Sequence, residues 1–117
     1  MIVNFLVGFV ALLHFYFMAL ESFFWTRPLG RKVFGSTAEY AETTRSLAAN
    51  QGVYNGFLAS GLVWTFFLEQ PFENSVRVFF LICVVIAGFI GAVTVNKKIF
   101  LVQGLPAVFA LAALTLN

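Results

Sequence analysis

The segment 47–68 constrains the fold more than any other part of the chain. It has the sequence LAANQGVYNGFLASGLVWTFFL, which is long enough to cross a bilayer as a helix although it contains three carboxamides. Gln51 and Asn55 are one helical turn apart and form a polar edge. Beside that edge, small residues recur at four-residue spacing, which lets a second helix approach closely: Ala48, Gly52, Gly56 and Ser60. The segment therefore predicts a transmembrane helix with a helix-packing edge.

The composition favours a protein embedded in a lipid bilayer. Of the 117 residues, 61% are apolar and 10% are charged, whereas about a quarter of the residues in soluble domains are charged. This length accommodates about four membrane spans in a single domain, residues 1–117. The net charge is only +2, and without a basic face we expect no nucleic-acid partner. Because Cys83 is the single cysteine, no internal disulfide can form.

The predicted fold class is an all-α integral membrane protein with four antiparallel transmembrane helices. The apolar runs that predict the spans cover about residues 2–24, 47–68, 76–95 and 99–116. The polar segment 25–46 is expected to be partly helical, because Ser36 and Glu39 fit a capping box with Ser36 as the N-cap. This helix is expected to begin near Thr37 and to continue without a break into the second span.

The cationic residues predict the orientation in the membrane. Six of the seven lie in the first and third loops: Arg27, Arg31, Lys32, Arg45, Lys97 and Lys98. Arg77, after the second loop, is the exception. Since cytoplasmic loops contain an excess of Lys and Arg, loops 25–46 and 96–98 are predicted to be cytoplasmic. Both termini are then outside, and the expected location is the plasma membrane.

Five polar residues inside the predicted spans are candidate ligand-binding groups: His14, Glu21, Gln51, Asn55 and Gln103. His14 and Glu21 are seven residues apart, so they share one helical face. At 1.5 Å per residue, Glu21, Gln51 and Gln103 lie about 5 Å inside the cytoplasmic ends of their helices. Asn55 and His14 lie deeper, at about 12 to 15 Å. These depths predict one polar pocket in the cytoplasmic half of the bundle.

Each candidate also has a structural interpretation. Glu21 would then be a carboxylate near a helix end, paired with a basic residue: Arg27, Arg31 or Lys98. His14 would be a neutral imidazole, satisfied by Asn55 or Gln51. The three amides would form hydrogen bonds between helices, each contributing about 0.6 to 2 kcal/mol.

Three segments resemble a known family. Residues 14–21 are HFYFMALE, residues 25–35 are WTRPLGRKVFG, and residues 47–59 are LAANQGVYNGFLA. In these segments the chain resembles the bacterial and fungal family called domain of unknown function 1304. The resemblance extends over the whole chain and is most specific in the first half. It implies a small multi-pass membrane protein with four spans, and it assigns no catalytic residue.

The preferred hypothesis is that the chain binds or transports a small hydrophobic or amphiphilic molecule. In it, Glu21 and His14 supply titratable groups. Gln51 and Asn55 orient the ligand, and Gln103 closes the polar ring. One alternative is a membrane enzyme that uses His14 and Glu21 to transfer protons on a lipid-like substrate. Another is a structural subunit that binds a partner, or a second copy in a homodimer, through the small-residue edge. We expect no metal or cofactor, because the sequence has one His and no phosphate-binding glycine loop.

Overall fold

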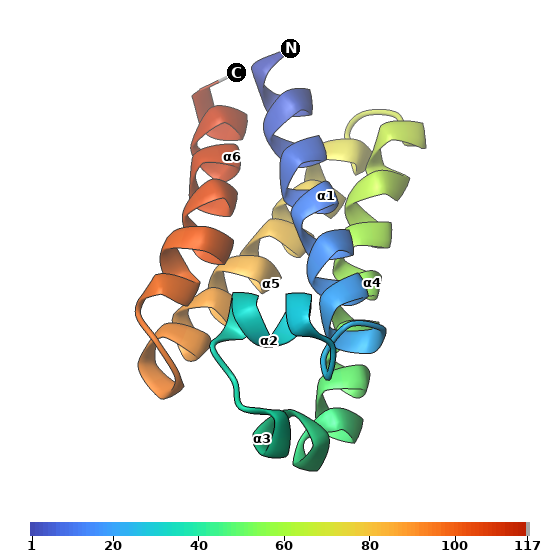
Figure 1. The fold of residues 1–117 in the computed structure, drawn as a ribbon. Helices are drawn as coiled ribbons and strands as arrows, with labels where there is room; N and C mark the ends of the chain where they lie inside the picture. The colour runs from blue at the N-terminus through green and yellow to red at the C-terminus, as the bar shows by residue number, and fades with distance from the viewer. Residues whose placement is uncertain (117) are drawn as a thin grey trace. The chain divides into compact units, whose positions relative to one another are not determined.

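The computed structural model describes residues 1–116, and every regular element in that range is a helix. The prediction of an all-helical protein is therefore confirmed. In chain order (Figure 1) the elements are α1 Ile2–Ser22, α2 Pro28–Phe34, α3 Ala38–Thr43, α4 Arg45–Trp64, the 3₁₀ helix η1 Thr65–Phe67, α5 Phe72–Thr94, the π-helix η2 Phe100–Gly104 and α6 Leu105–Leu116. The residues group into two compact units, and each is described separately.

The first unit contains Met1–Leu13 and the chain from Leu58 onward. Its core is made by the first half of α1, the end of α4, and α5 and α6, which lie side by side (Figure 1). The buried positions recur every three or four residues along each helix, as expected for one face of a helix: Val3, Val7, Val10, Ala11, Leu62, Leu81, Val84, Ala107 and Ala110.

The second unit, His14–Phe57, contains the end of α1, the short helices α2 and α3, and most of α4. After α2, Gly35 adopts a left-handed conformation with φ 64°, which a residue without Cβ tolerates best. The N–H of Ser36 then donates to the Arg31 carbonyl and helps to end α2. Thr37 is therefore the N-cap of α3, and its hydroxyl accepts from the Tyr40 N–H at 3.1 Å. The predicted N-cap at Ser36 was one residue too early.

Thr44 separates α3 from α4, so the predicted unbroken helix from Thr37 into the second span is wrong. At this residue φ is −100° and ψ is 7°. The Thr44 hydroxyl donates to the Tyr40 carbonyl at 2.7 Å and accepts from the Trp25 indole N–H at 3.0 Å. A threonine hydroxyl that bonds to the carbonyl four residues earlier often bends a helix. Trp25 thereby fixes the junction to the turn that follows α1.

Two of the four predicted spans are long and apolar enough to cross a membrane. These are α1 and α5. In the most apolar 18-residue stretch of each helix, only 28% (α1) and 22% (α5) is buried inside the protein. The helix α4 is long enough but has a lower hydropathy, because Asn50, Gln51 and Asn55 interrupt its apolar run. The apolar stretch Phe100–Leu116 is shorter. It begins with a π-helix, which accommodates Pro106, since a proline cannot donate a backbone hydrogen bond.

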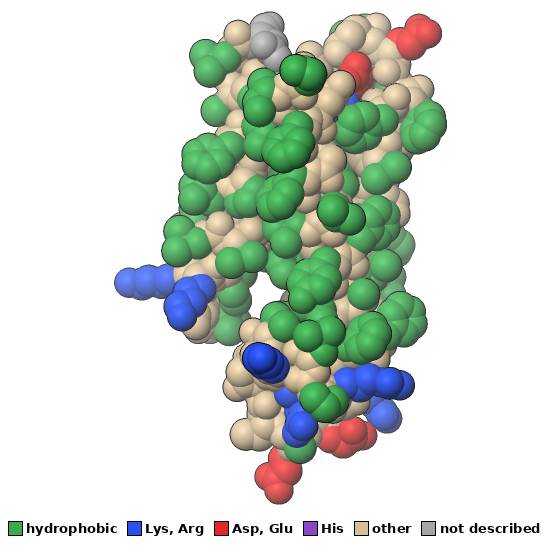
Figure 2. Space-filling view, turned by 45° about the horizontal axis from the view of Figure 1, so that its top comes forward, with side chains coloured by type: hydrophobic (Ala, Val, Ile, Leu, Met, Phe, Trp, Pro, Cys, Tyr) green, Lys and Arg blue, Asp and Glu red, His purple; other side chains and the backbone are tan. Residues whose placement is uncertain are grey.

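Large hydrophobic side chains are exposed in both units (Figure 2). On α5 they follow one another along the helix: Val78, Phe79, Ile82, Ile86, Phe89, Ile90 and Val93. Soluble monomers rarely expose contiguous apolar patches larger than a few hundred Å². A surface of this kind needs an apolar environment or a partner to cover it.

Candidate functional site

One face of α1 is buried, and it includes the histidine and the carboxylate of this helix. His14 is 0% exposed and Glu21 is 3% exposed. Val7 and Val10 are buried on the same face, as their spacing of three to four residues requires. A buried carboxylate needs hydrogen-bond donors or a countercharge around it, since its transfer from water is costly.

Glu21 is held by two carboxamides of α4. The Gln51 Nε2 donates to Glu21 Oε2 at 2.6 Å, and the Asn55 Nδ2 donates to Glu21 Oε1. Each carboxylate oxygen therefore accepts from a different amide, and the two amides are one turn apart on α4. Asn55 is almost fully buried, whereas Gln51 is exposed. The three residues come together within the His14–Phe57 unit.

Glycines on α4 allow this close approach to α1. A Cβ at Gly52 would lie 2.2 Å from the Ser22 Oγ and 3.1 Å from the Met18 carbonyl oxygen. A Cβ at Gly56 would lie 2.8 Å from the Met18 sulfur. Ala48 is also buried. The Ser22 hydroxyl donates to the Ala49 carbonyl at 3.4 Å and joins the same two helices. At Gly52 and Gly56 the small-residue edge thus packs against α1 inside one chain.

Ser60 does not belong to this packing edge, although the four-residue spacing predicted that it would. Ser60 is exposed, and Ala59 is buried instead. Four residues exceed one helical turn by about 40°, so three such steps rotate a side chain by about 120° away from the starting face.

Glu21 has no cationic partner in the described part of the chain. The ion pairs found in residues 1–116 are Arg45–Glu42 at 3.5 Å and Arg77–Glu73 at 2.6 Å. The structural interpretation in which Glu21 pairs with Arg27, Arg31 or Lys98 is therefore not what the structure contains. Glu21 is a buried carboxyl group with two neutral donors and no countercharge.

His14 belongs to the same unit as Glu21, and Gln103 belongs to the other unit. His14 is about 10 Å before Glu21 along α1, and its ring packs edge-on against Phe17 at 5.6 Å. One N–H of Gln51 and one of Asn55, the two amides expected to satisfy His14, donate to Glu21. Gln103 is half-buried in the π-helix η2 of the other unit.

A surface hollow of about 430 Å³ is found at another place in the His14–Phe57 unit. Its lining residues are Phe34, Gly35, Ser36, Thr37 and Tyr40. None of the candidate ligand-binding residues lines it. At the Glu21 cluster, Glu21 and Asn55 are buried and Gln51 is exposed to the surroundings.

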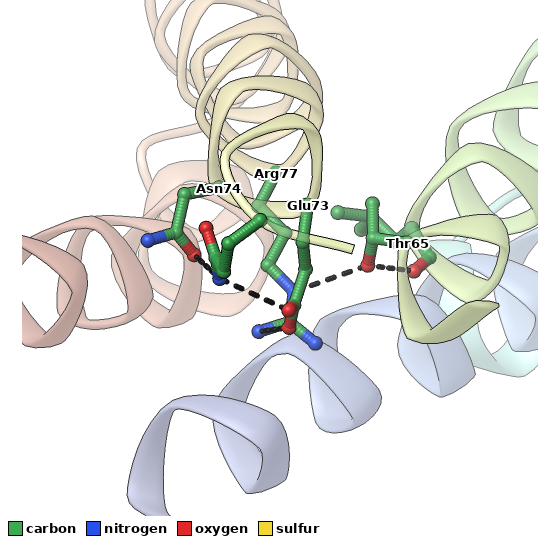
Figure 3. Close-up of polar contacts among 6 residues, drawn as sticks. Thr65, Glu73, Asn74 and Arg77 are labelled. Carbon is green, nitrogen blue, oxygen red and sulfur yellow. Dashed lines mark hydrogen bonds and ion pairs between the residues drawn. The ribbon is translucent and has the colours of Figure 1, made fainter. Parts of the chain in front are cut away.

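Arg77 is the polar residue that sequence reasoning missed. It lies near the start of α5, is 2% exposed, and forms its ion pair with Glu73 one turn earlier. Its Nε donates to the Thr65 Oγ1 at 3.1 Å, and its guanidinium lies 4.9 Å from the centre of the Phe66 ring. Figure 3 shows Arg77 extending from α5 between Glu73 and Thr65. The spacing of Glu73 and Arg77 was the available signal, but the predicted span began only at Val76.

The sequence comparison agrees with the resemblance seen in the three motif segments. The family described as Protein of unknown function (DUF1304) matches residues 8–115. The chain belongs to this family. The DUF1304 match includes Glu21, Gln51 and Asn55 as well as Arg77. A similar protein from Lactococcus lactis subsp. lactis (strain IL1403), Uncharacterized protein YpaA, is 38% identical over 104 residues, which are 87% of each chain. No solved structure matches this member of the DUF1304 family.

Proposed function

We propose that this protein spans the membrane four times and binds a small hydrophobic or amphiphilic molecule, whose polar end is held at Glu21, Gln51 and Asn55. The observation that supports this most is the buried Glu21 carboxyl group, which has two amide donors and no ion pair with any residue from 1 to 116. Amides alone are sufficient to join helices in a membrane. An ionisable group at such a position is costly, and in membrane helices these groups commonly belong to substrate or ion pathways.

The surface supports a membrane location. The exposed apolar side chains of α5 match what a bilayer would cover. The helix α4 is too polar to be identified as a span by hydropathy, but its amides at Gln51 and Asn55 are directed at α1 and need not face lipid. An intramembrane helix commonly places its polar residues toward the interior of the protein.

The proposed orientation, with loops 25–46 and 96–98 in the cytoplasm, has a direct test. In a Cys83→Ala background, we expect Thr37→Cys and Lys97→Cys to react with a membrane-impermeant maleimide only in inverted vesicles. Glu69→Cys should react only in right-side-out vesicles. All three positions are exposed. Labelling of Glu69→Cys and Lys97→Cys from the same side would contradict the four-span topology.

Asn55→Ala should release the bound molecule. Native mass spectrometry of the protein purified in mild detergent, followed by lipid extraction, is expected to find one defined molecule retained by the wild type. The substitution removes a buried donor to Glu21, and we expect occupancy to fall about tenfold, as for the loss of a charge-assisted hydrogen bond.

Asn50→Ala is the matched control, because it removes the same side chain from an exposed position on the same helix. It should retain the molecule fully. If neither the wild type nor Asn50→Ala retains a defined molecule, or if Asn55→Ala retains it equally well, the proposed site is incorrect.

A further inference from the structure

The direction of the two amide hydrogen bonds determines which groups the cluster offers to a ligand. Gln51 and Asn55 both turn their nitrogen atoms toward Glu21, so their carbonyl oxygens remain as acceptors. An ionised carboxylate accepts about four hydrogen bonds, and here it accepts two within the protein. The cluster is left with about six acceptor positions and about two N–H donors. It is therefore suited to a ligand that donates hydrogen bonds.

The charge of the surroundings favours a cation. Glu21 lies in the last turn of α1, which contains no basic residue. The carbonyl groups at a helix C-terminus give that end a partial negative charge, which attracts cations. The negative end of α1 and the Glu21 carboxylate thus reinforce each other, and no ion pair within residues 1–116 neutralises Glu21.

Other charged groups of the same unit do not substitute for a cationic ligand. On α4, the residues that face Glu21 are Gln51 and Asn55, which do not titrate. The other titratable group on this face of α1 is His14, two turns away. Arg27 lies in the turn between α1 and α2, with its guanidinium 5.8 Å from the centre of the Phe24 ring. The helices α2 and α3 contain Arg31, Lys32, Glu39 and Glu42, and Glu42 is paired with Arg45 at the start of α4. None of these forms an ion pair with Glu21.

From these observations we propose that the polar end of the bound amphiphile is an organic ammonium ion, R–NH3⁺, which donates hydrogen bonds to Glu21 and to the carbonyl oxygens of Gln51 and Asn55. This inference rests on the proposed function and specifies its ligand class. If Glu21 is protonated beforehand, binding of R–NH3⁺ releases that proton, so one positive charge replaces another. The exposed side of Gln51 is the entrance, and Tyr54, exposed one turn further along α4, is positioned beside the apolar chain R.

Three amphiphiles with the same chain and different polar ends test this inference. Radiolabelled dodecylammonium, dodecanol and dodecanoate are equilibrated with the protein in phosphatidylcholine nanodiscs, and empty nanodiscs provide the blank. We expect saturable binding of dodecylammonium with a Kd about tenfold below that of dodecanol, and no saturable binding of dodecanoate. In Glu21→Gln the preference for the cation should fall below about twofold. Glu39→Gln removes an exposed carboxylate from the same unit and should leave the preference unchanged.

Each outcome separates the inference from the proposed function. Tighter binding of dodecanol or dodecanoate would overturn the inference and leave the amphiphile site in place. If none of the three amphiphiles binds saturably, the inference is overturned. Native mass spectrometry would then show, by whether a molecule is retained, if the proposed function survives. Loss of the cation preference in Glu39→Gln would also overturn the inference. If Glu21→Gln does not fold, the order of the three Kd values in the wild type is still decisive.

Discussion

Gly52→Leu is expected to lower the free energy of unfolding by about 3 kcal/mol, the upper range for overpacking. The new Cβ would lie 2.2 Å from the Ser22 Oγ, and the Met18 carbonyl oxygen and Ser22 backbone nitrogen are 3.1 and 3.2 Å away. The serine hydroxyl can move, but the backbone of α1 cannot move without separating Glu21 from its two amides. The measurement is thermal unfolding of the purified protein in detergent, monitored by circular dichroism.

Ser60→Leu is the control for Gly52→Leu. It places the same side chain at the last position of the four-residue pattern, which is exposed, so the change in unfolding free energy should stay within about 0.5 kcal/mol. If Gly52→Leu changed the oligomeric state without changing stability, the small-residue edge would be a contact between chains, and the internal packing described above would be incorrect.

Glu73→Gln is the second substitution with a large expected effect, a loss of about 3 kcal/mol of stability. It removes the partner of a guanidinium whose side chain is only 3% exposed, while Glu73 itself is 21% exposed. The Arg77 Nη2 already has no hydrogen-bond partner within residues 1–116, so the variant leaves a buried guanidinium without its countercharge, although the amide oxygen introduced at position 73 can still accept from it. Chemical unfolding in mixed micelles measures the loss.

Two further variants test whether the unpaired charge of Arg77 causes the loss of stability in Glu73→Gln. Glu69→Gln removes an exposed carboxylate just before α5 and should change stability by less than about 0.5 kcal/mol. The double variant Glu73→Gln/Arg77→Met should recover much of the loss, because it removes the unpaired charge and keeps an apolar side chain of similar length. A double variant no more stable than Glu73→Gln would mean that the contacts of Arg77 with Thr65 and Phe66 matter more than its charge.

The sequence predicted correctly which residues lie together where a regular helix determines which residues share a face. The seven-residue spacing of His14 and Glu21 placed both on one face of α1, and both are buried. Gln51 and Asn55, one turn apart beside Gly52, are the residues that meet Glu21. These features follow from helical geometry and from the cost of burying polar groups.

The sequence was less informative where local hydrogen bonds compete with the regular helix. The break at Thr44 depends on hydrogen bonds of its hydroxyl with Tyr40 and Trp25. Trp25 is 19 residues away in the sequence, and the pattern of apolar residues does not single out Tyr40. The Arg77–Glu73 pair was missed because α5 begins at Phe72, which extends the helix into a segment that resembles a loop. Even the packing edge ends earlier than its spacing suggests, because four residues are slightly more than one turn.

The most direct test of the account is the pH dependence of dodecylammonium binding to the wild type and to Glu21→Gln in nanodiscs. Lowering the pH protonates the Glu21 carboxylate and removes the negative charge that attracts the cation, whereas the alkylammonium stays charged. We therefore expect the wild-type Kd to rise as the pH falls, and the Kd of Glu21→Gln to be higher and independent of pH. An equal pH dependence in both proteins would contradict the role of Glu21 as the group that binds the ligand.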